Sequence, residues 1–153
     1  MCWQCDPPDR TLGDYLEVLR STIREHGWVV QYVEDDRMPY AYTIGMHQRG
    51  LPEFLTTGLP PKRALWLLNT FAKRALAGRP PIPGNQVRLP AGTRVELVRI
   101  DHPEAHMDMA IGIAGPDISA MQLVWADDRS RWPWSADFAD GRQRQAVLGV
   151  RGP

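Results

Sequence analysis

Two amphipathic helical segments, separated by short β-rich segments, constrain the fold of this chain more than any other feature. The clearer of the two follows Pro60 and Pro61 and ends at Gly78. Proline suits the first turn of a helix because its missing N–H would have no intrahelical partner there, and glycine favours the C-terminal end. The apolar residues that recur with helical spacing predict its buried stripe: Ala64, Leu65, Leu68, Ala72, Ala75 and Leu76.

The second helical segment begins near Thr11 and ends at Gly27. Thr11 and Asp14 fit a capping box, in which each side chain accepts the other residue's backbone N–H. Its apolar face is predicted to hold Leu12, Tyr15, Leu16, Leu19 and Ile23.

Short segments rich in β-branched and aromatic residues predict the strands, and the first two of them are expected to form a hairpin. The strands are predicted at residues 28–33, 40–46, 54–57, 93–100 and 121–125, with a short helix from Pro103 through Ala110. This order predicts an α+β fold, a mostly antiparallel sheet with the two main helices packed on one face. We expect a single domain over residues 11–150, preceded by an extended N-terminal arm at residues 1–10.

The charge balance argues against two classes of partner. Eighteen basic and 18 acidic residues give a formal net charge of zero, so no long-range field attracts nucleic acid or an anionic membrane. Near-zero charge permits self-association, so a homo-oligomer is one expectation. The sequence has neither the ~20-residue apolar run of a spanning helix nor a secretory signal pattern, which predicts a cytoplasmic protein.

Cys2 and Cys5 form a C-x-x-C pair, which places two sulfurs close enough to hold one metal. His102 and His106 would complete a tetrahedral zinc site if a helix placed both rings on one face. Because nearly the whole chain separates the two pairs, such a site would be a clasp between the arm and the domain. His26 and His47 are alternative third ligands, which would leave a position open for catalysis. The alternative is an exposed, reduced thiol pair without metal.

Thiol chemistry at the same pair is a further alternative. A reactive C-x-x-C gains from a helix N-terminus, which lowers the thiol pKa, whereas Asp6 and two prolines follow Cys5. Thioredoxin-like catalysis is therefore disfavoured. Haem attachment is excluded because it requires histidine where Asp6 stands.

Two groups of side chains could bind a ligand. Trp125, Trp132 and Trp134 lie among charged residues and could wall a cleft for a flat or apolar molecule, or could instead seal the edge of the sheet. Tyr42 and His47, followed by Glu53, could supply acid–base chemistry, or His47 could be an ordinary solvated histidine.

Several short motifs occur in an order that is typical of one bacterial family. They are Gly27-Trp28, Gln31-Tyr32-Val33, Tyr42-Thr43-Ile44-Gly45, Leu51-Pro52-Glu53, Gly58-Leu59-Pro60, residues 122–127, Trp132-Pro133-Trp134 and Leu148-Gly149. The chain resembles the proteins of domain of unknown function 4262, which are common in actinobacteria. In one departure, Ser130 stands where the family usually has glycine. The resemblance implies a shared fold and pocket and supplies no catalytic residues.

Motif searches find no nucleophile elbow, phosphate loop, dinucleotide fingerprint or H-E-x-x-H zinc motif. The sequence therefore favours a module that binds a small molecule or a protein partner, with a possible N-terminal zinc site. The alternative is a metal- or thiol-dependent enzyme or redox sensor that uses Cys2, Cys5 and a nearby histidine.

Overall fold

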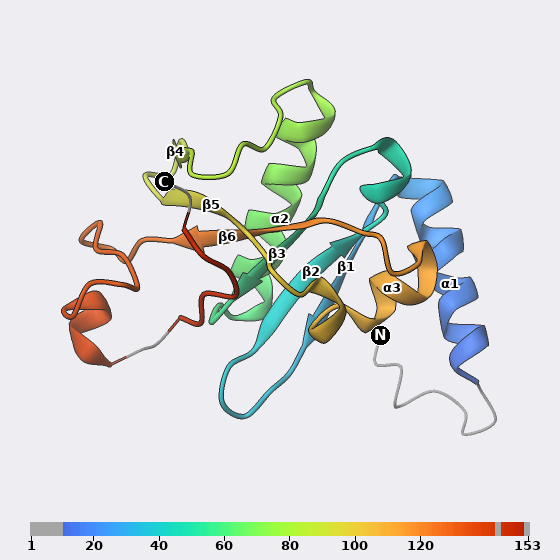
Figure 1. Cartoon of the computed structure of the whole chain (residues 1–153), viewed down its shortest axis with the longest axis horizontal. Helices are drawn as coiled ribbons and strands as arrows, with labels where there is room; N and C mark the ends of the chain where they lie inside the picture. Colours follow the sequence, from blue (N-terminus) through green and yellow to red (C-terminus); the bar gives the residue numbers. More distant parts are fainter. Residues whose placement is uncertain (1–10, 143–144, 152–153) are drawn as a thin grey trace.

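The computed structural model describes residues 11–142 and 145–151, which form one mixed α/β unit (Figure 1). The predicted arm and its two cysteines lie outside the described residues. In chain order the helices and strands are α1 (Leu12–His26), β1 (Val29–Val33), β2 (Tyr40–Ile44), η2 (His47–Arg49), β3 (Glu53–Thr57), α2 (Pro61–Leu76), β4 (Gln86–Arg88), β5 (Arg94–Arg99), η3 (Pro103–Ala105), α3 (Asp108–Ala114), β6 (Ala120–Trp125) and η4 (Phe138–Gly141).

Within the described residues the strands form one six-stranded sheet in the order β1-β2-β3-β6-β5-β4. The predicted β1–β2 hairpin is confirmed, and β2–β3, β6–β5 and β5–β4 are also antiparallel. Only β3 and β6 pair in parallel among these strands. The crossover between them contains α2, β4, β5 and α3. The α+β class is therefore confirmed, with a mixed sheet.

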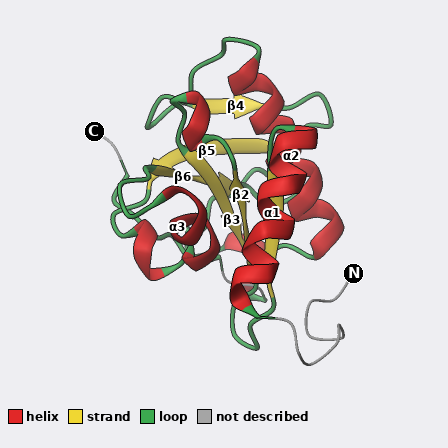
Figure 2. Cartoon of the chain, turned by 90° about the vertical axis from the view of Figure 1, so that its right-hand side faces the viewer, coloured by secondary structure: helices red, strands yellow, loops and turns green. Residues whose placement is uncertain are grey.

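The helices lie on both faces of the sheet, so the prediction that the two main helices share one face was wrong. Helix α2 packs in one apolar cluster with Phe54 and Leu123, whereas α1 and α3 share a second cluster with Tyr42 and Leu55. Figure 2 shows the sheet between α2 and α3. A helical period shows that a helix has one buried stripe, but it carries no information on which face of a sheet receives it.

The buried stripe of α2 follows most of the prediction, because Ala64, Leu68, Ala72 and Ala75 are buried and Leu76 is half-buried. Leu65 is 47% exposed, while Leu67 and Phe71 are buried with Ala64, Leu68 and others. Helical spacing alone does not distinguish Leu65 from Leu67, and packing against the sheet selects Leu67.

The predicted helix from Pro103 to Ala110 is replaced by two shorter elements. Residues Pro103–Ala105 form a single 3-10 turn, and α3 begins only at Asp108. His102 and His106 flank the 3-10 turn, so the expected helical face that would carry both rings does not form. Strand β4 was also missed, because Gln86–Arg88 is short and lies next to a proline-rich loop.

Helix α1 begins as predicted. Thr11 accepts the Asp14 backbone N–H at 3.1 Å, and Asp14 accepts the Thr11 N–H at 3.0 Å. At the other end, Gly27 (φ +95°) terminates the helix and comes close to Gly45 (φ +124°). A Cβ at position 45 would lie 2.8 Å from the Gly27 carbonyl oxygen, so this junction between α1 and β2 requires glycine.

The C-terminal segment is held by side chains of the sheet. Gln122 is fully buried; its amide donates to the Ala146 carbonyl at 2.6 Å and accepts the Leu148 N–H at 2.7 Å. A Cβ at Gly149 would lie 1.8 Å from the Arg99 carbonyl oxygen. The Leu148-Gly149 motif therefore marks a place where two backbone segments touch.

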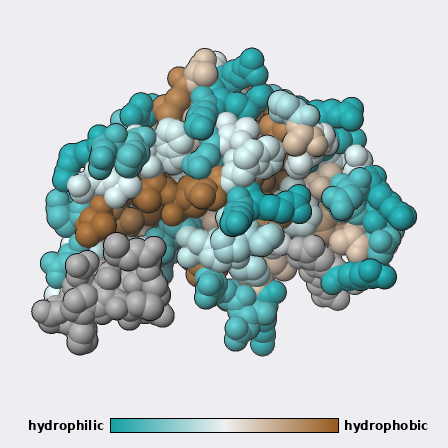
Figure 3. Space-filling view, turned by 180° about the vertical axis from the view of Figure 1, so that it is seen from behind, coloured by the Kyte–Doolittle hydropathy of each residue, from teal (hydrophilic) through white to brown (hydrophobic). Residues whose placement is uncertain are grey.

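Exposed apolar atoms gather in a band on the half of the molecule that carries α1 and β1 (Figure 3). Val18 and Leu12 of α1 are 49% and 58% exposed. No helix among the described residues has the length and apolar character that crossing a membrane would require.

Candidate functional site

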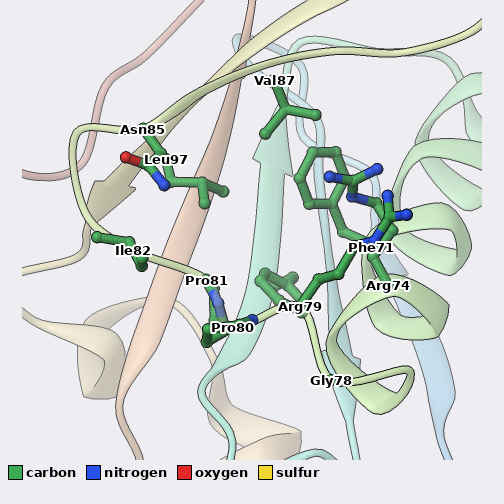
Figure 4. Close-up of a pocket in the computed structure, with 11 residues that line it drawn as sticks. Phe71, Arg74, Gly78, Arg79, Pro80, Pro81, Ile82, Asn85, Val87 and Leu97 are labelled. Atoms are coloured by element: carbon green, nitrogen blue, oxygen red, sulfur yellow. The ribbon is translucent and has the colours of Figure 1, made fainter.

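A cleft opens between the C-terminal half of α2 and the loop that leads to β4 (Figure 4). We call it the α2 cleft; its volume is about 340 Å³, and its lining residues are Phe54, Phe71, Arg74, Gly78, Arg79, Pro80, Pro81, Ile82, Asn85, Val87 and Leu97. Phe71 projects toward the cleft from α2, while Leu97, Asn85 and Ile82 lie across from it. The lining is therefore mainly apolar.

The positive charges of the α2 cleft lie on one side of it. Arg74 and Arg79 flank Phe71 in Figure 4, and the Arg74 guanidinium carbon lies 5.7 Å from the Phe71 ring centroid. Among the residues that the structure describes, neither guanidinium is paired with a carboxylate. An apolar cavity bordered by two uncompensated arginines is suited to a ligand with an apolar body and an anionic group.

Tyr42 and His47, which were predicted to act together, lie in different surroundings. Tyr42 belongs to the cluster below α1 and α3, where its hydroxyl accepts the Met109 N–H at 3.1 Å. Burial raises the pKa of Tyr42, so its hydroxyl stays protonated at neutral pH. His47 lies in the η2 turn and is half-buried.

Glu53 is fully buried and holds the chain between β2 and η2 in place. One carboxylate oxygen accepts the Thr43 hydroxyl at 2.9 Å and the Met46 N–H at 3.1 Å. The other accepts the N–H groups of Gly45 and His47 at 3.1 and 3.2 Å. Burial raises the pKa of Glu53 and outweighs the opposing effect of these four donors. With all of its oxygens engaged, Glu53 is a structural anchor and not an available base.

The three predicted tryptophans lie in two different environments. Trp125 is 5% exposed; its indole N–H donates to the Thr57 carbonyl at 2.8 Å and its ring packs 5.4 Å from that of Phe138. Trp132 and Trp134 instead stack on each other nearer the surface, with ring centroids 5.3 Å apart and planes 8° apart.

The outer face of Trp134 is covered by Arg151, whose guanidinium carbon lies 3.7 Å from the ring centroid. A guanidinium cannot fit between rings 5.3 Å apart, so it must lie on the face away from Trp132. The same guanidinium donates two hydrogen bonds to Glu96, at 2.8 and 3.0 Å. Trp132 and Arg151 thus lie on opposite faces of the Trp134 ring, and the residue is still 37% exposed.

Asp127 organises a polar loop whose structural role the sequence pattern did not reveal. Its carboxylate accepts the N–H groups of Arg129, Arg131 and Ala139 and the Arg131 Nε–H, all at 2.8 to 3.0 Å. Burial alone would raise the pKa of Asp127, but these hydrogen bonds lower it to about 2. Ser130 takes a positive φ of 60° in this loop, in the left-handed region that glycine adopts most readily. The i, i+4 spacing of Asp127 and Arg131 is the signal that could have revealed the pair.

The predicted zinc ligands are not gathered in the part of the chain that the structure describes. His102 is exposed and lies 3.2 Å from Glu104, whereas His106 packs edge-on against Tyr40. Across residues 11–142 and 145–151 no group of three or more His, Cys, Asp or Glu side chains could hold a metal ion. Cys2 and Cys5 lie outside these ranges, so a zinc clasp stays a prediction.

Comparison with known proteins identifies the family. The model of Domain of unknown function (DUF4262) matches residues 22–139, a span that runs from the end of α1 through the Asp127 loop. No curated protein and no solved structure matches the chain. The matched span contains Gly45, Glu53, the α2 cleft and the Trp132–Trp134 stack. The chain therefore belongs to the DUF4262 family.

Proposed function

We propose that this protein is a binding module for a small molecule with an apolar body and a carboxylate or phosphate group, held in the α2 cleft. The single observation that carries the proposal is the juxtaposition of an apolar cavity with two arginines that lack a carboxylate partner within the described residues. The cavity volume of about 340 Å³ falls at the lower end of the range for small-molecule sites.

The two parts of the cleft have different roles in this proposal. Phe54, Phe71, Val87 and Leu97 take the ligand's apolar body out of water, which supplies most of the binding free energy. Arg74 and Arg79 select for negative charge through charge-assisted hydrogen bonds. Arg74 also lies in the last turn of α2, where a cation complements the helix dipole, so any test has to separate this local role from ligand binding.

The test uses a pair of fluorescent probes that differ in charge. Anilinonaphthalene sulfonate is an apolar anion, and phenylnaphthylamine is its neutral counterpart. We expect saturable binding of one anionic probe per chain, weakened about tenfold by Arg74→Gln or Arg79→Gln, with little change for the neutral probe. Val87→Trp should fill the cavity and abolish binding of both probes.

Lys73→Gln is the matched control. Lys73 lies in the same last turn of α2, so its loss alters the helix dipole similarly, but it does not line the cleft. Equal weakening by Lys73→Gln and Arg74→Gln would assign the effect to general charge and contradict the proposal. Probe binding that survives Val87→Trp unchanged would place the site elsewhere.

A further inference from the structure

Strand β1 forms one edge of the sheet and lacks the features that usually protect an edge. Among the described residues no strand pairs with its outer side. Its sequence, Val-Val-Gln-Tyr-Val, contains no charge, proline or glycine and has high β-propensity. Edge strands of monomeric proteins are generally protected by charges, prolines or bulges, because their free N–H and C=O groups pair readily with another strand.

The side chains of β1 are also incompletely covered. All five residues are half-buried, whereas every residue of the central strand β6 is buried. The exposed apolar band in Figure 3 lies on this half of the molecule. An apolar surface on the same half of the molecule as an edge strand that no other described strand pairs with is typical of an interaction site.

Opposite charges lie at the two ends of β1. Before the strand, Arg20, Arg24 and Arg49 line a hollow of about 440 Å³ beside Gly27. Glu17 contacts the first two, at 3.7 and 3.3 Å, while Arg49 has no carboxylate partner among the residues described. After the strand come three exposed acidic residues, Glu34, Asp35 and Asp36.

We infer that β1 pairs antiparallel with β1 of a second copy of this chain, about a two-fold axis at Gln31. In this arrangement Val29 lies opposite Val33 of the second copy, and Val30 lies opposite its Tyr32, so apolar side chains meet on both faces. The acidic end of each strand meets the arginine-lined hollow of the other copy. The strand is therefore complementary to itself in both shape and charge, as a two-fold interface requires. The two sheets would join into one continuous sheet.

The experiment measures mass and amide exchange over a range of concentrations of the full-length chain. Light scattering coupled to gel filtration should show a monomer–dimer equilibrium. Hydrogen exchange at residues 29–33 should slow as the dimer forms, because the outward N–H groups of β1 become bonded. Exchange in β4, at the opposite edge, should not change with concentration.

Gln31→Glu is the discriminating variant. Its carboxylate can still accept the Tyr15 hydroxyl, which Gln31 accepts at 2.6 Å, so the monomer should fold normally. At the two-fold axis, however, two like charges would face each other, and we expect dimerisation to weaken by about tenfold or more. Arg129→Gln, at an exposed position of the loop that follows β6, lowers the net charge by the same amount and is the control.

The proposal predicts a dimer that Gln31→Glu disrupts and Arg129→Gln preserves, with unchanged circular dichroism for both variants. A chain that is monomeric at every concentration would overturn it. So would a dimer that tolerates Gln31→Glu, or β1 amides that are protected equally at all concentrations, since the latter would mean that the edge is covered within one chain.

Discussion

Glu53 and Asp127 each collect four hydrogen bonds and each hold a loop in place, yet their surroundings differ. Glu53 accepts three backbone N–H groups and one hydroxyl without a nearby cation in the described structure. Asp127 accepts three backbone N–H groups and the Arg131 guanidinium, which also contacts Asp140 at 2.9 Å. Their pKa values accordingly move in opposite directions, upward for Glu53 and downward for Asp127.

This difference shows that the number of hydrogen bonds alone does not decide whether the charged form of a carboxylate is stabilised and its pKa lowered. Complete burial of Glu53 disfavours the charge more than four neutral donors favour it. At Asp127 a charge-assisted bond from Arg131 adds to the backbone donors, and the side chain retains 8% exposure. A hydrogen-bonded carboxylate thus anchors each of the two loops, but the charged form is disfavoured at Glu53 and favoured at Asp127.

Removing the buried anchor should have the largest effect. Glu53→Ala leaves three backbone N–H groups without an acceptor, so we expect the free energy of unfolding to fall by about 3–5 kcal/mol. Glu53→Gln keeps one acceptor oxygen but turns an NH₂ group toward backbone donors, so the expected loss is about 2 kcal/mol. Urea unfolding measures both. Glu25→Gln, at an exposed position, should change stability little, and a loss below about 1 kcal/mol for Glu53→Ala would contradict the anchoring role.

The Asp127 loop should respond less strongly. Asp127→Asn removes the charge-assisted bond to Arg131 and replaces one acceptor, and we expect a loss of about 1–3 kcal/mol in the free energy of unfolding. Combining it with Arg131→Gln should cost less than the sum of the single changes, because both remove the same interaction. Asp128→Asn, its exposed neighbour, is the control. Additive losses would mean that the pair is not coupled.

Acidification should separate the two carboxylates by the sign of its effect. The pKa of Glu53 is raised in the folded protein, so its contribution to stability is present below its unfolded pKa of about 4.5 and is lost as pH rises through the folded value. Relative to Glu53→Gln, the wild type should therefore gain stability as pH falls from 7 toward 4.5. The pKa of Asp127 is lowered to about 2, so its contribution is present above about 3.8 and is lost as pH falls through 2.

The stability difference between wild type and Asp127→Asn should accordingly shrink between pH 4 and 2. Urea titrations of wild type, Glu53→Gln and Asp127→Asn from pH 7 to pH 2 provide the measurement. If both differences change with the same sign, the contrast between the two loops is wrong.

Glu96 is a buried carboxylate whose cationic partner is partly exposed. Of the changes considered, removing that partner should lower the free energy of unfolding least. The Glu96 side chain is 4% exposed, but its partner Arg151 is 47% exposed and lies at the protein surface. Arg151→Gln should lower the free energy of unfolding by about 1 kcal/mol or less, since a solvent-exposed cation contributes little. Trp134 fluorescence should change as its outer face is uncovered. A loss as large as that of Glu53→Ala would mean that the C-terminal segment depends on this single pair.

The helices and most strands could be predicted from local patterns. The capping box of Thr11, the prolines before α2 and the alternation of β-rich segments with turns act within a few residues, so they are readable in the sequence. The predictions that were wrong depend on local signals that are weak or that fit two alternatives. Leu65 and Leu67 are equally apolar, and Pro103 starts only one 3-10 turn.

Most residues of the candidate site could not be predicted from the sequence. The α2 cleft joins Phe54, Phe71, Val87 and Leu97, which lie on four different elements. Tyr42 and His47 are close in sequence but lie in different surroundings. Tyr42 packs below α1 and α3, whereas the His47 backbone N–H donates to the Glu53 carboxylate. Trp125 was expected beside Trp132, but it is buried against Phe138.

By itself, the sequence determined where most helices and strands begin and end and to which family the chain belongs. Those properties follow from local sterics, caps and periodicity, or from motifs in a fixed order. Only the tertiary structure decided which face of the sheet each helix covers, how Glu53 and Asp127 differ, and which side chains form the cleft. These depend on burial and on contacts between distant residues, and a one-dimensional pattern carries neither.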